Sequence, residues 1–172
     1  SLLILIGIKN FLFIINKGQK ENFLKSIGST TDLGINIEFK EQSKPNGLPE
    51  AFILGEKFIG KDSVLMILGD NFFYGSMLSP VIKNSLSIKN GANIYLYPSK
   101  NTSAYGVVEL KNNGEINKII EKPTFTKSNL VITGMYIFDN NVVKYAKKLK
   151  PSKRNELEMV DLINIYKKKN NL

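Results

Sequence analysis

The sequence predicts an α/β protein with a doubly wound, mostly parallel, Rossmann-like sheet and a few antiparallel strands. Strand and helix patterns alternate along the N-terminal half of the chain, which is typical of parallel sheets covered by helices. Residues 63–68 form a short continuous apolar run, as expected of a central strand covered on both faces. The length of 172 residues, with 42% hydrophobic and 23% charged residues, indicates a single globular unit.

The expected helices have apolar residues at helical spacing, and the expected strands are apolar runs or alternate with period two. The chain opens with the end of a buried helix and a turn at Gly7, followed by an interior strand at 11–15. After these come a helix at 19–27 closed by Gly28, a strand at 35–41, a helix at 48–58, the strand at 63–68, a helix at 77–88 and a strand at 92–97.

From Gly106 onward the predicted strands are shorter, at 106–110, 116–121 and 131–138. The run Asn112-Asn113-Gly114 predicts a hairpin turn between the first two. Two helices follow, at 141–149 and 156–169. Because the chain begins with an apolar helix tail and no methionine, we expect residues 1–172 to be one partial domain, an interior fragment that is incomplete at both ends.

The composition excludes several kinds of chemistry. With 0 Cys and 0 His, the chain has no disulfide, no thiolate or imidazole metal ligand and no histidine acid or base. The net charge of +9 comes largely from lysines after Lys144, and Arg154 is the sole arginine, so we expect no nucleic-acid partner. The apolar start is interrupted at Lys9 and is too short to span a bilayer, so we expect no membrane segment and a cytoplasmic location.

Candidate ligand-binding residues follow the predicted strands, because ligands of open α/β sheets bind beyond the carboxyl ends of the strands. Asp70 lies in Gly-Asp-Asn directly after the central strand and could hold Mg²⁺. Gln42 could face a base edge, and Gly47 would let the backbone approach a ring. Taken singly, each of these residues is better explained by ordinary turn chemistry.

A second group of candidates lies around the shorter strands. Tyr105 and Gly106 open one strand, while Glu121-Lys122-Pro123 closes another, and we expect the proline to keep Lys122 in extended backbone. A glutamate accepting sugar hydroxyls beside a lysine meeting a phosphate would make a sugar-phosphate site, although a surface Glu–Lys pair is the simpler explanation. Gly134 within an apolar strand predicts the close approach of another backbone or a ligand.

Taken in order, these motifs resemble the glucose-1-phosphate thymidylyltransferase family of sugar nucleotidyltransferases, whose fold is related to that of GT-A glycosyltransferases. The likeness covers essentially all of the chain. The motifs that carry it are Gln42-x-x-x-x-Gly47-Leu48, Leu68-Gly69-Asp70-Asn71, Phe73-Tyr74-Gly75, Tyr105-Gly106-Val-Val-Glu109, Glu121-Lys122-Pro123, Ser128-Asn129, Thr133-Gly134-x-Tyr136, Leu149-Lys-Pro-Ser152 and Glu156-Leu-Glu-x-x-Asp161.

The resemblance implies Mg²⁺-dependent transfer of dTMP from dTTP to glucose 1-phosphate, giving dTDP-glucose and pyrophosphate for the dTDP-rhamnose pathway and polysaccharide synthesis. It also implies a homo-oligomer, typically a tetramer. In the implied site, Gln42 and Gly47 bind the nucleotide base, Asp70 binds the nucleotide and one Mg²⁺, Lys122 binds the sugar phosphate, Tyr105, Gly106, Glu121 and Gly134 line the sugar, and Ile132 and Tyr136 lie beside it. Lys122 and Asp70 are the implied catalytic residues.

Two features of that family do not occur here. The glycine-rich GG-x-GTRL-x-P loop with its following lysine is absent, as is the Trp-Leu-Asp-x-Gly segment that carries the second metal-binding aspartate. We therefore expect this polypeptide alone to be inactive. A related uridylyl- or cytidylyltransferase is the nearest alternative. A metal-dependent glycosyltransferase is less favoured because no Asp-x-Asp occurs, and a basic nucleic-acid-binding module is the alternative from another class.

Overall fold

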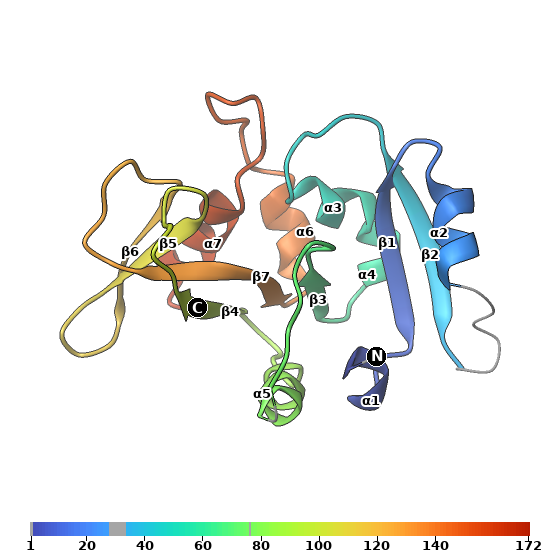
Figure 1. Cartoon of the computed structure of the whole chain (residues 1–172), viewed down its shortest axis with the longest axis horizontal. Coiled ribbons are helices and arrows are strands. Elements are labelled where there is room, and N and C mark those ends of the chain that lie inside the picture. The colour runs from blue at the N-terminus through green and yellow to red at the C-terminus, as the bar shows by residue number, and fades with distance from the viewer. Residues whose placement is uncertain (1, 28–33, 76) are drawn as a thin grey trace.

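The computed structural model describes residues 2–27, 34–75 and 77–172 (Figure 1). The helices are α1 (Leu2–Leu5), α2 (Lys20–Ile27), α3 (Glu50–Leu54), α4 (Glu56–Ile59), α5 (Leu78–Ser85), α6 (Asn141–Ala146) and α7 (Met159–Lys168). The strands are β1 (Asn10–Asn16), β2 (Asn36–Gln42), β3 (Val64–Ile67), β4 (Ala92–Pro98), β5 (Gly106–Leu110), β6 (Ile116–Glu121) and β7 (Leu130–Phe138). Gly28, the expected end of the helix at 19–27, lies outside the described residues.

The strands form a two-stranded and a five-stranded sheet that lie side by side, with β2 and β6 at opposite ends (Figure 1). β1 and β2 pair in parallel, with Asn10 opposite Asn36. β7 is the centre of the larger sheet and runs antiparallel to β3, β4 and β5, while β5 and β6 form the expected hairpin. The α/β class is confirmed, but antiparallel pairings are more numerous than the alternating pattern predicted, because β7 returns between strands of the opposite direction.

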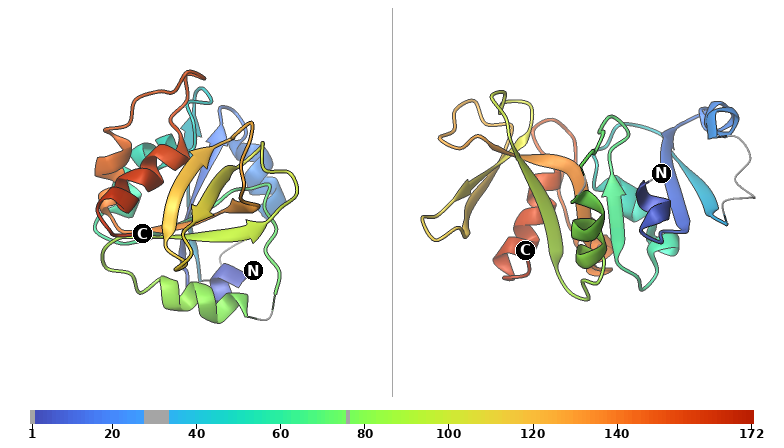
Figure 2. Two further views of the ribbon diagram at one scale, coloured as in Figure 1. Left: turned by 90° about the vertical axis from the view of Figure 1, so that its left-hand side faces the viewer. Right: turned by 60° about the horizontal axis from the view of Figure 1, so that its bottom comes forward.

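Helices cover both faces of the five-stranded sheet (Figure 2). On one face, α3, α6 and α7 bury a core that includes Val108, Phe138 and Leu162. On the other face, α5 packs Ile82 against Met135 and Ile137 of β7. Because successive residues of a strand point to opposite faces, β7 contributes to both cores, which explains its almost continuous apolar sequence.

The expected helix at 48–58 is divided into α3 and α4 at Gly55. A Cβ atom on Gly55 would lie 2.9 Å from a methyl carbon of Leu12 and 3.0 Å from the carbonyl oxygen of Ala51. Gly55 therefore gives β1 room to pack closely against this helical segment. The apolar spacing predicted helical structure here, but it indicated neither the break at Gly55 nor the contact with Leu12.

Three expectations of burial near the N-terminus were wrong. α1 contains no buried residue, and Leu5 is 83% exposed. In β1 only Ile15 is buried, and all four residues of β3 are half-buried rather than covered on both faces. Among the described residues β1 pairs only with β2 and β3 pairs only with β7, so each strand lacks a hydrogen-bonded neighbour on its other side. No helix in the described ranges is both long and apolar enough to cross a membrane.

Candidate sugar-phosphate site

Three predicted residues, Gly106, Glu121 and Ile132, meet where β5, β6 and β7 come together. Gly106 is directly opposite Glu121 in the β5–β6 pair, and a Cβ atom on Gly106 would lie 3.7 Å from a carboxylate oxygen of Glu121. The same Cβ would lie 3.2 Å from the Cδ1 atom of Ile132 in β7. Gly134 follows Ile132 on the same face of β7, since side chains two residues apart in a strand point the same way.

The Glu121 carboxylate is half-buried at the end of β6. Burial raises its pKa above the ordinary value, and the neighbouring charge of Glu158 raises it further, while Arg154 and Lys122 act in the opposite direction. A carboxylate in this setting is held among protein charges instead of being fully solvated. Such a group is suited to accepting hydrogen bonds from the hydroxyl groups of a neutral ligand.

Lys122 adopts a left-handed backbone conformation with φ 39°, so the expectation of extended backbone before Pro123 was wrong. The Lys122 N–H donates to the carbonyl of Tyr105 at 3.0 Å, which extends the β5–β6 pairing beyond Glu121. The bond holds Lys122 at the end of the strand pair, in place of the extended conformation that is usual before proline. The Lys122 side chain is exposed, and its charge acts to lower the pKa of the neighbouring Glu121.

Asp70 is linked to Gly134 of β7 by hydrogen bonds through its neighbour Asn71. The Asn71 side chain donates to the Asp70 carboxylate at 2.8 Å and accepts from the Gly134 N–H at 3.3 Å. A Cβ atom on Gly134 would lie only 2.4 Å from the Asn71 side-chain nitrogen. A close approach does occur at Gly134, but the group that makes it is the Asn71 side chain and not the expected backbone or ligand.

Ile132 and Tyr136 are buried. Each is 5% exposed and belongs to the main core. Burial, followed by the charge of Glu121, raises the pKa of the Tyr136 hydroxyl, which indicates that the ring lies near the Glu121 carboxylate. These two side chains therefore belong to the core that supports the exposed residues of the candidate site.

Gln42 and Gly47 belong to a separate loop that joins β2 to α3. The Gln42 amide donates to the Glu50 carboxylate and, at 3.4 Å, to the Gly47 carbonyl, while Asn46 donates to Glu50 at 2.8 Å. Gly47 has φ 100°, and a Cβ atom there would lie 2.1 Å from the Leu157 carbonyl oxygen. The glycine at position 47 is therefore explained by close packing against backbone of the same chain.

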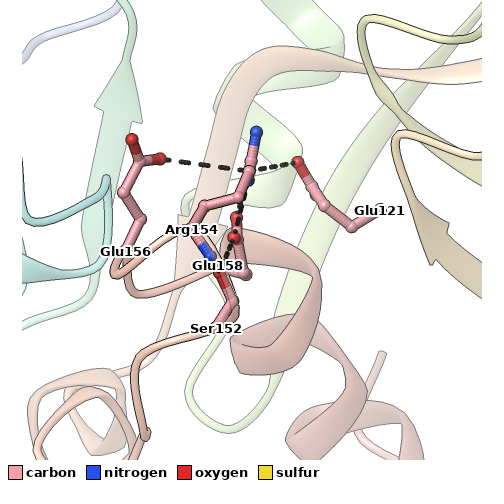
Figure 3. A network of polar contacts seen from close by, with 5 residues as sticks. All are labelled: Glu121, Ser152, Arg154, Glu156 and Glu158. Atoms are coloured by element: carbon pink, nitrogen blue, oxygen red, sulfur yellow. Dashed lines mark hydrogen bonds and ion pairs between the residues drawn. The ribbon is translucent and has the colours of Figure 1, made fainter.

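Arg154 and Glu158 are parts of this region that sequence reasoning did not assign (Figure 3). Arg154 contacts Glu158 through two nitrogens, at 2.6 and 3.1 Å, and reaches Glu121 at 3.3 Å. One sequence signal pointed to it. Arg154 is the sole arginine among 24 basic residues, and arginine is the cation suited to two-point carboxylate pairing.

The described residues offer limited ligands for a cation. They contain no group of three or more Asp, Glu, His or Cys side chains able to hold a metal ion. Asp70 is exposed, and one of its carboxylate oxygens accepts the hydrogen bond from Asn71. Because Mg²⁺ commonly uses one or two carboxylates together with water and phosphate oxygens, Asp70 fits as a single protein ligand.

Two surface hollows lie elsewhere. One, of about 460 Å³, is lined by residues of α4 and α6 that include Glu56 and Lys147, and the other, of about 510 Å³, lies beside α7. None of the predicted site residues lines either hollow. The predicted site residues lie near the ends of β3, β5 and β6 and along β7, where Tyr105 and Lys122 are exposed while Ile132, Gly134 and Tyr136 are buried.

An α/β sheet with carboxylate and lysine side chains at its strand ends has the arrangement of the class of open α/β proteins, in which ligands bind beyond the ends of the strands. The chain belongs to the nucleotidyl transferase family, whose family model matches residues 1–172.

Curated relatives share one name. The chain is 42% identical over 166 residues to a glucose-1-phosphate thymidylyltransferase of Neisseria meningitidis, covering 96% of this chain and 58% of the relative. It is 40% identical to a Mycobacterium tuberculosis protein of the same name, covering 95% of this chain and 57% of the relative. The chain thus spans somewhat more than half the length of these relatives.

Solved structures give the same picture. A Bacillus anthracis crystal structure assigned to glucose-1-phosphate thymidylyltransferase superposes with a TM-score of 0.88 at 33% identity, covering 99% of this chain and 69% of that one. A UDP-glucose pyrophosphorylase superposes with a TM-score of 0.76 at 20% identity, covering 99% of this chain and 74% of that one, and this likeness concerns the fold alone. The Rossmann-like fold expected from the sequence is confirmed.

Proposed function

We propose that the chain is part of a glucose-1-phosphate thymidylyltransferase and provides the sugar-phosphate side of its active site. The observation that carries this proposal is the meeting of Gly106, Glu121 and Ile132 at one end of the β5–β6 pair, with the Lys122 N–H bonded to the Tyr105 carbonyl beside them. The names of the curated relatives support the same reaction.

In this proposal the sugar lies beside Glu121 and Tyr105, at the edge of the sheet. The space over the two glycines is filled by the protein, because Val160 and Ile132 lie over Gly106 and Asn71 lies over Gly134. Glu121 accepts hydrogen bonds from hydroxyl groups of the sugar on one side. The exposed Tyr105 side chain lies at the border of the proposed sugar position. Ile132 and Tyr136 support the site from below.

Lys122 binds the phosphate of glucose 1-phosphate. Its exposed side chain directly follows Glu121 in the chain, next to the proposed sugar position. A phosphate oxygen of the sugar monoester attacks the α-phosphorus of dTTP, and the bond to pyrophosphate breaks. Lys122 orients the attacking group and offsets its negative charge. Asp70 would hold Mg²⁺, which when bound would neutralise charge on the triphosphate.

The base side depends on Gln42 and Gly47. The Gln42 amide nitrogen is engaged with Glu50, so its carbonyl oxygen is the atom to face a base N–H. UTP is the second candidate nucleotide, since a UDP-glucose pyrophosphorylase shares the fold. Thermal shifts with dTTP, UTP and CTP in the presence of Mg²⁺ compare the three, and a larger shift with UTP or CTP would contradict the thymidylyl assignment.

Titration of the purified chain with glucose 1-phosphate tests the sugar-phosphate side. We expect binding that weakens about tenfold or more in Glu121→Gln and Lys122→Ala, because each removes a charge-assisted contact. Lys118→Ala is the matched control, since Lys118 is another exposed lysine of β6. Equal loss in the control, or no binding by the unaltered chain, would contradict the proposal.

Further parts of the proposal await their own measurements. They are the use of Mg²⁺, assembly as a homo-oligomer such as a tetramer, a cytoplasmic location, and supply of dTDP-glucose to dTDP-rhamnose and polysaccharide synthesis. We also expect the 172-residue polypeptide to release no pyrophosphate from dTTP and glucose 1-phosphate with Mg²⁺, because its described residues supply only one proposed metal ligand. A coupled pyrophosphate assay measures this directly.

A further inference from the structure

The segment from Ser152 to Glu158 carries the most densely connected group of charges near the candidate site (Figure 3). Glu158 is its anchor, with a side chain only 9% exposed. One carboxylate oxygen accepts from the Arg154 Nη2 at 2.6 Å, and the other accepts from the Arg154 Nε at 3.1 Å and the Ser152 hydroxyl at 2.5 Å. Both oxygens are therefore occupied by donors from the same short loop.

Arg154 links this anchor to the candidate site. Its side chain is 41% exposed, and the nitrogen that contacts Glu158 also lies 3.3 Å from a Glu121 carboxylate oxygen. A half-exposed arginine ordinarily samples many rotamers, at a cost in entropy whenever one is selected. The two-point contact with Glu158 selects one rotamer and places the guanidinium beside Glu121.

The charges explain why such an arrangement is needed. Glu121 and Glu158 repel one another, and this repulsion adds to the effect of burial in raising the pKa of Glu121. Burial opposes ionisation of Glu158 as well, but hydrogen bonds from Arg154 and Ser152 keep its pKa below the ordinary value. Arg154 lies between the two carboxylates as their shared counter-charge, with Lys122 and Asp161 as the remaining charged groups acting on Glu121.

We propose that Glu158 is a positioning residue, which holds Arg154 against Glu121 and so fixes the Glu121 carboxylate for the sugar hydroxyls. This inference rests on the proposed function, because it concerns the same site. Glu158 itself touches no substrate in this arrangement. Its effect on binding passes through Arg154.

The loop backbone has its own supports, which separates this role from simple folding of the segment. The Leu157 N–H donates to the Asn46 carbonyl at 2.8 Å, and the Ser152 N–H donates to the Glu156 carbonyl at 2.8 Å. These backbone contacts involve no Glu158 side-chain atom. Replacement of the Glu158 carboxylate should therefore release Arg154 while leaving the path of the chain in place.

The sole arginine makes the arrangement directly observable. A ¹⁵N–¹H spectrum of the chain contains one arginine Nε–H signal, that of Arg154, and no assignment is required. In the unaltered chain we expect a sharp signal protected from exchange with water, because this N–H donates to Glu158. In Glu158→Gln the signal should broaden or exchange at least tenfold faster, and in Glu156→Gln it should be unchanged.

Glu156→Gln is the matched control. Glu156 lies in the same loop, but its carboxylate is 3.9 Å from the Arg154 guanidinium, which is too long for a hydrogen bond. Unaltered exchange in Glu158→Gln would overturn the proposal, as would equal acceleration in the control. Thermal unfolding monitors whether each variant is folded. If Glu158→Gln does not fold, Ser152→Ala, which removes only the hydroxyl that supports Glu158, is expected to accelerate exchange to a smaller degree.

Glucose 1-phosphate titrations of the same variants separate this inference from the proposed function. We expect about tenfold weaker binding in Glu158→Gln and Arg154→Ala, partial recovery in Glu158→Asp, and less than a twofold change in Glu156→Gln. Binding by Glu158→Gln at the original strength would overturn the positioning role while leaving the proposed function intact. Absence of binding by the unaltered chain would instead contradict the proposed function, and the Nε–H signal alone would then decide whether Glu158 holds Arg154.

Discussion

Gly47 and Leu157 pack so closely that any side chain at position 47 would overlap the Leu157 backbone. A Cβ atom would lie 2.1 Å from the Leu157 carbonyl oxygen and 2.6 Å from its nitrogen. The neighbouring Asn46 carbonyl accepts from the Leu157 N–H at 2.8 Å. The loop after β2 and the loop before α7 are thus joined backbone to backbone.

Gly47→Ala should therefore destabilise the chain by about 3 kcal/mol, from left-handed strain together with the overlap. Urea unfolding measures the free energy. Gly114→Ala isolates the strain, because Gly114 has φ 83° but an added methyl group there would meet no atom within 4 Å. We expect the control to lose about 1 kcal/mol, and equal losses at the two positions would show that the Leu157 contact is unimportant.

Lys122→Gly should separate the strain at Lys122 from the use of its ammonium group. Glycine adopts the φ of 39° without the steric penalty of a Cβ, so we expect stability to be kept or to rise by up to about 1 kcal/mol. Glucose 1-phosphate binding should nevertheless be lost. Asn155→Gly, at φ 58°, should show the same gain in urea unfolding with no loss of binding. A stable Lys122→Gly that still binds would contradict the phosphate role.

Gly134→Ala should displace the Asn71 side chain, since the added methyl would lie 2.4 Å from the Asn71 amide nitrogen. Asn71 is exposed and able to swing away, so we expect a loss of less than about 1 kcal/mol. The Asn71 side-chain amide signals in a ¹⁵N–¹H spectrum should shift, because the hydrogen bond to Asp70 breaks. Gly69→Ala, with open space around it, should leave them in place, and no shift in Gly134→Ala would refute the contact.

Glu121→Gln should raise stability at neutral pH while weakening glucose 1-phosphate binding. The pKa of Glu121 is raised in the folded chain above its ordinary value of 4.5, chiefly by burial, so its ionisation costs the folded state free energy. The stability that this group contributes is complete below pH 4.5 and is lost as the pH rises through the folded pKa. We expect a gain of less than about 1 kcal/mol at about pH 7 and none at about pH 3.5.

Chemical unfolding of Glu121→Gln at both pH values measures this difference. Glu115→Gln is the control, because an exposed hydrogen bond from Lys111 lowers the pKa of Glu115. The control should show no gain at neutral pH. A destabilised Glu121→Gln would mean that the Arg154 pair outweighs burial at this carboxylate.

Sequence patterns were sufficient for the features set by near neighbours. The alternation of residues 35–41 predicted β2, and Asn112-Asn113-Gly114 predicted the β5–β6 hairpin, because both depend on local backbone preferences. Glycine within β7 predicted the close approach at Gly134. These preferences involve only a few neighbouring residues, so they are the same in the folded chain as in the isolated segment.

Features set by distant partners could not be predicted in this way. Gly55, where the helical segment breaks, packs against Leu12, and Lys122, with its left-handed backbone, is hydrogen-bonded to Tyr105. The pairing of Arg154 with Glu121 joins residues 33 positions apart. Spacing within one segment carries no information about such contacts, so the residues were visible in the sequence while their partners were not.

The backbone junction between Asn46–Gly47 and Leu157 has a consequence for exchanging parts with relatives. A chimera could import the β2–α3 loop of another nucleotidyl transferase in order to alter base choice. The imported loop would be shaped to pack against the loop before α7 of that relative, not against Leu157 of this chain. The two loops should therefore be transplanted as a matched set, and base choice and sugar choice should prove hard to re-engineer independently.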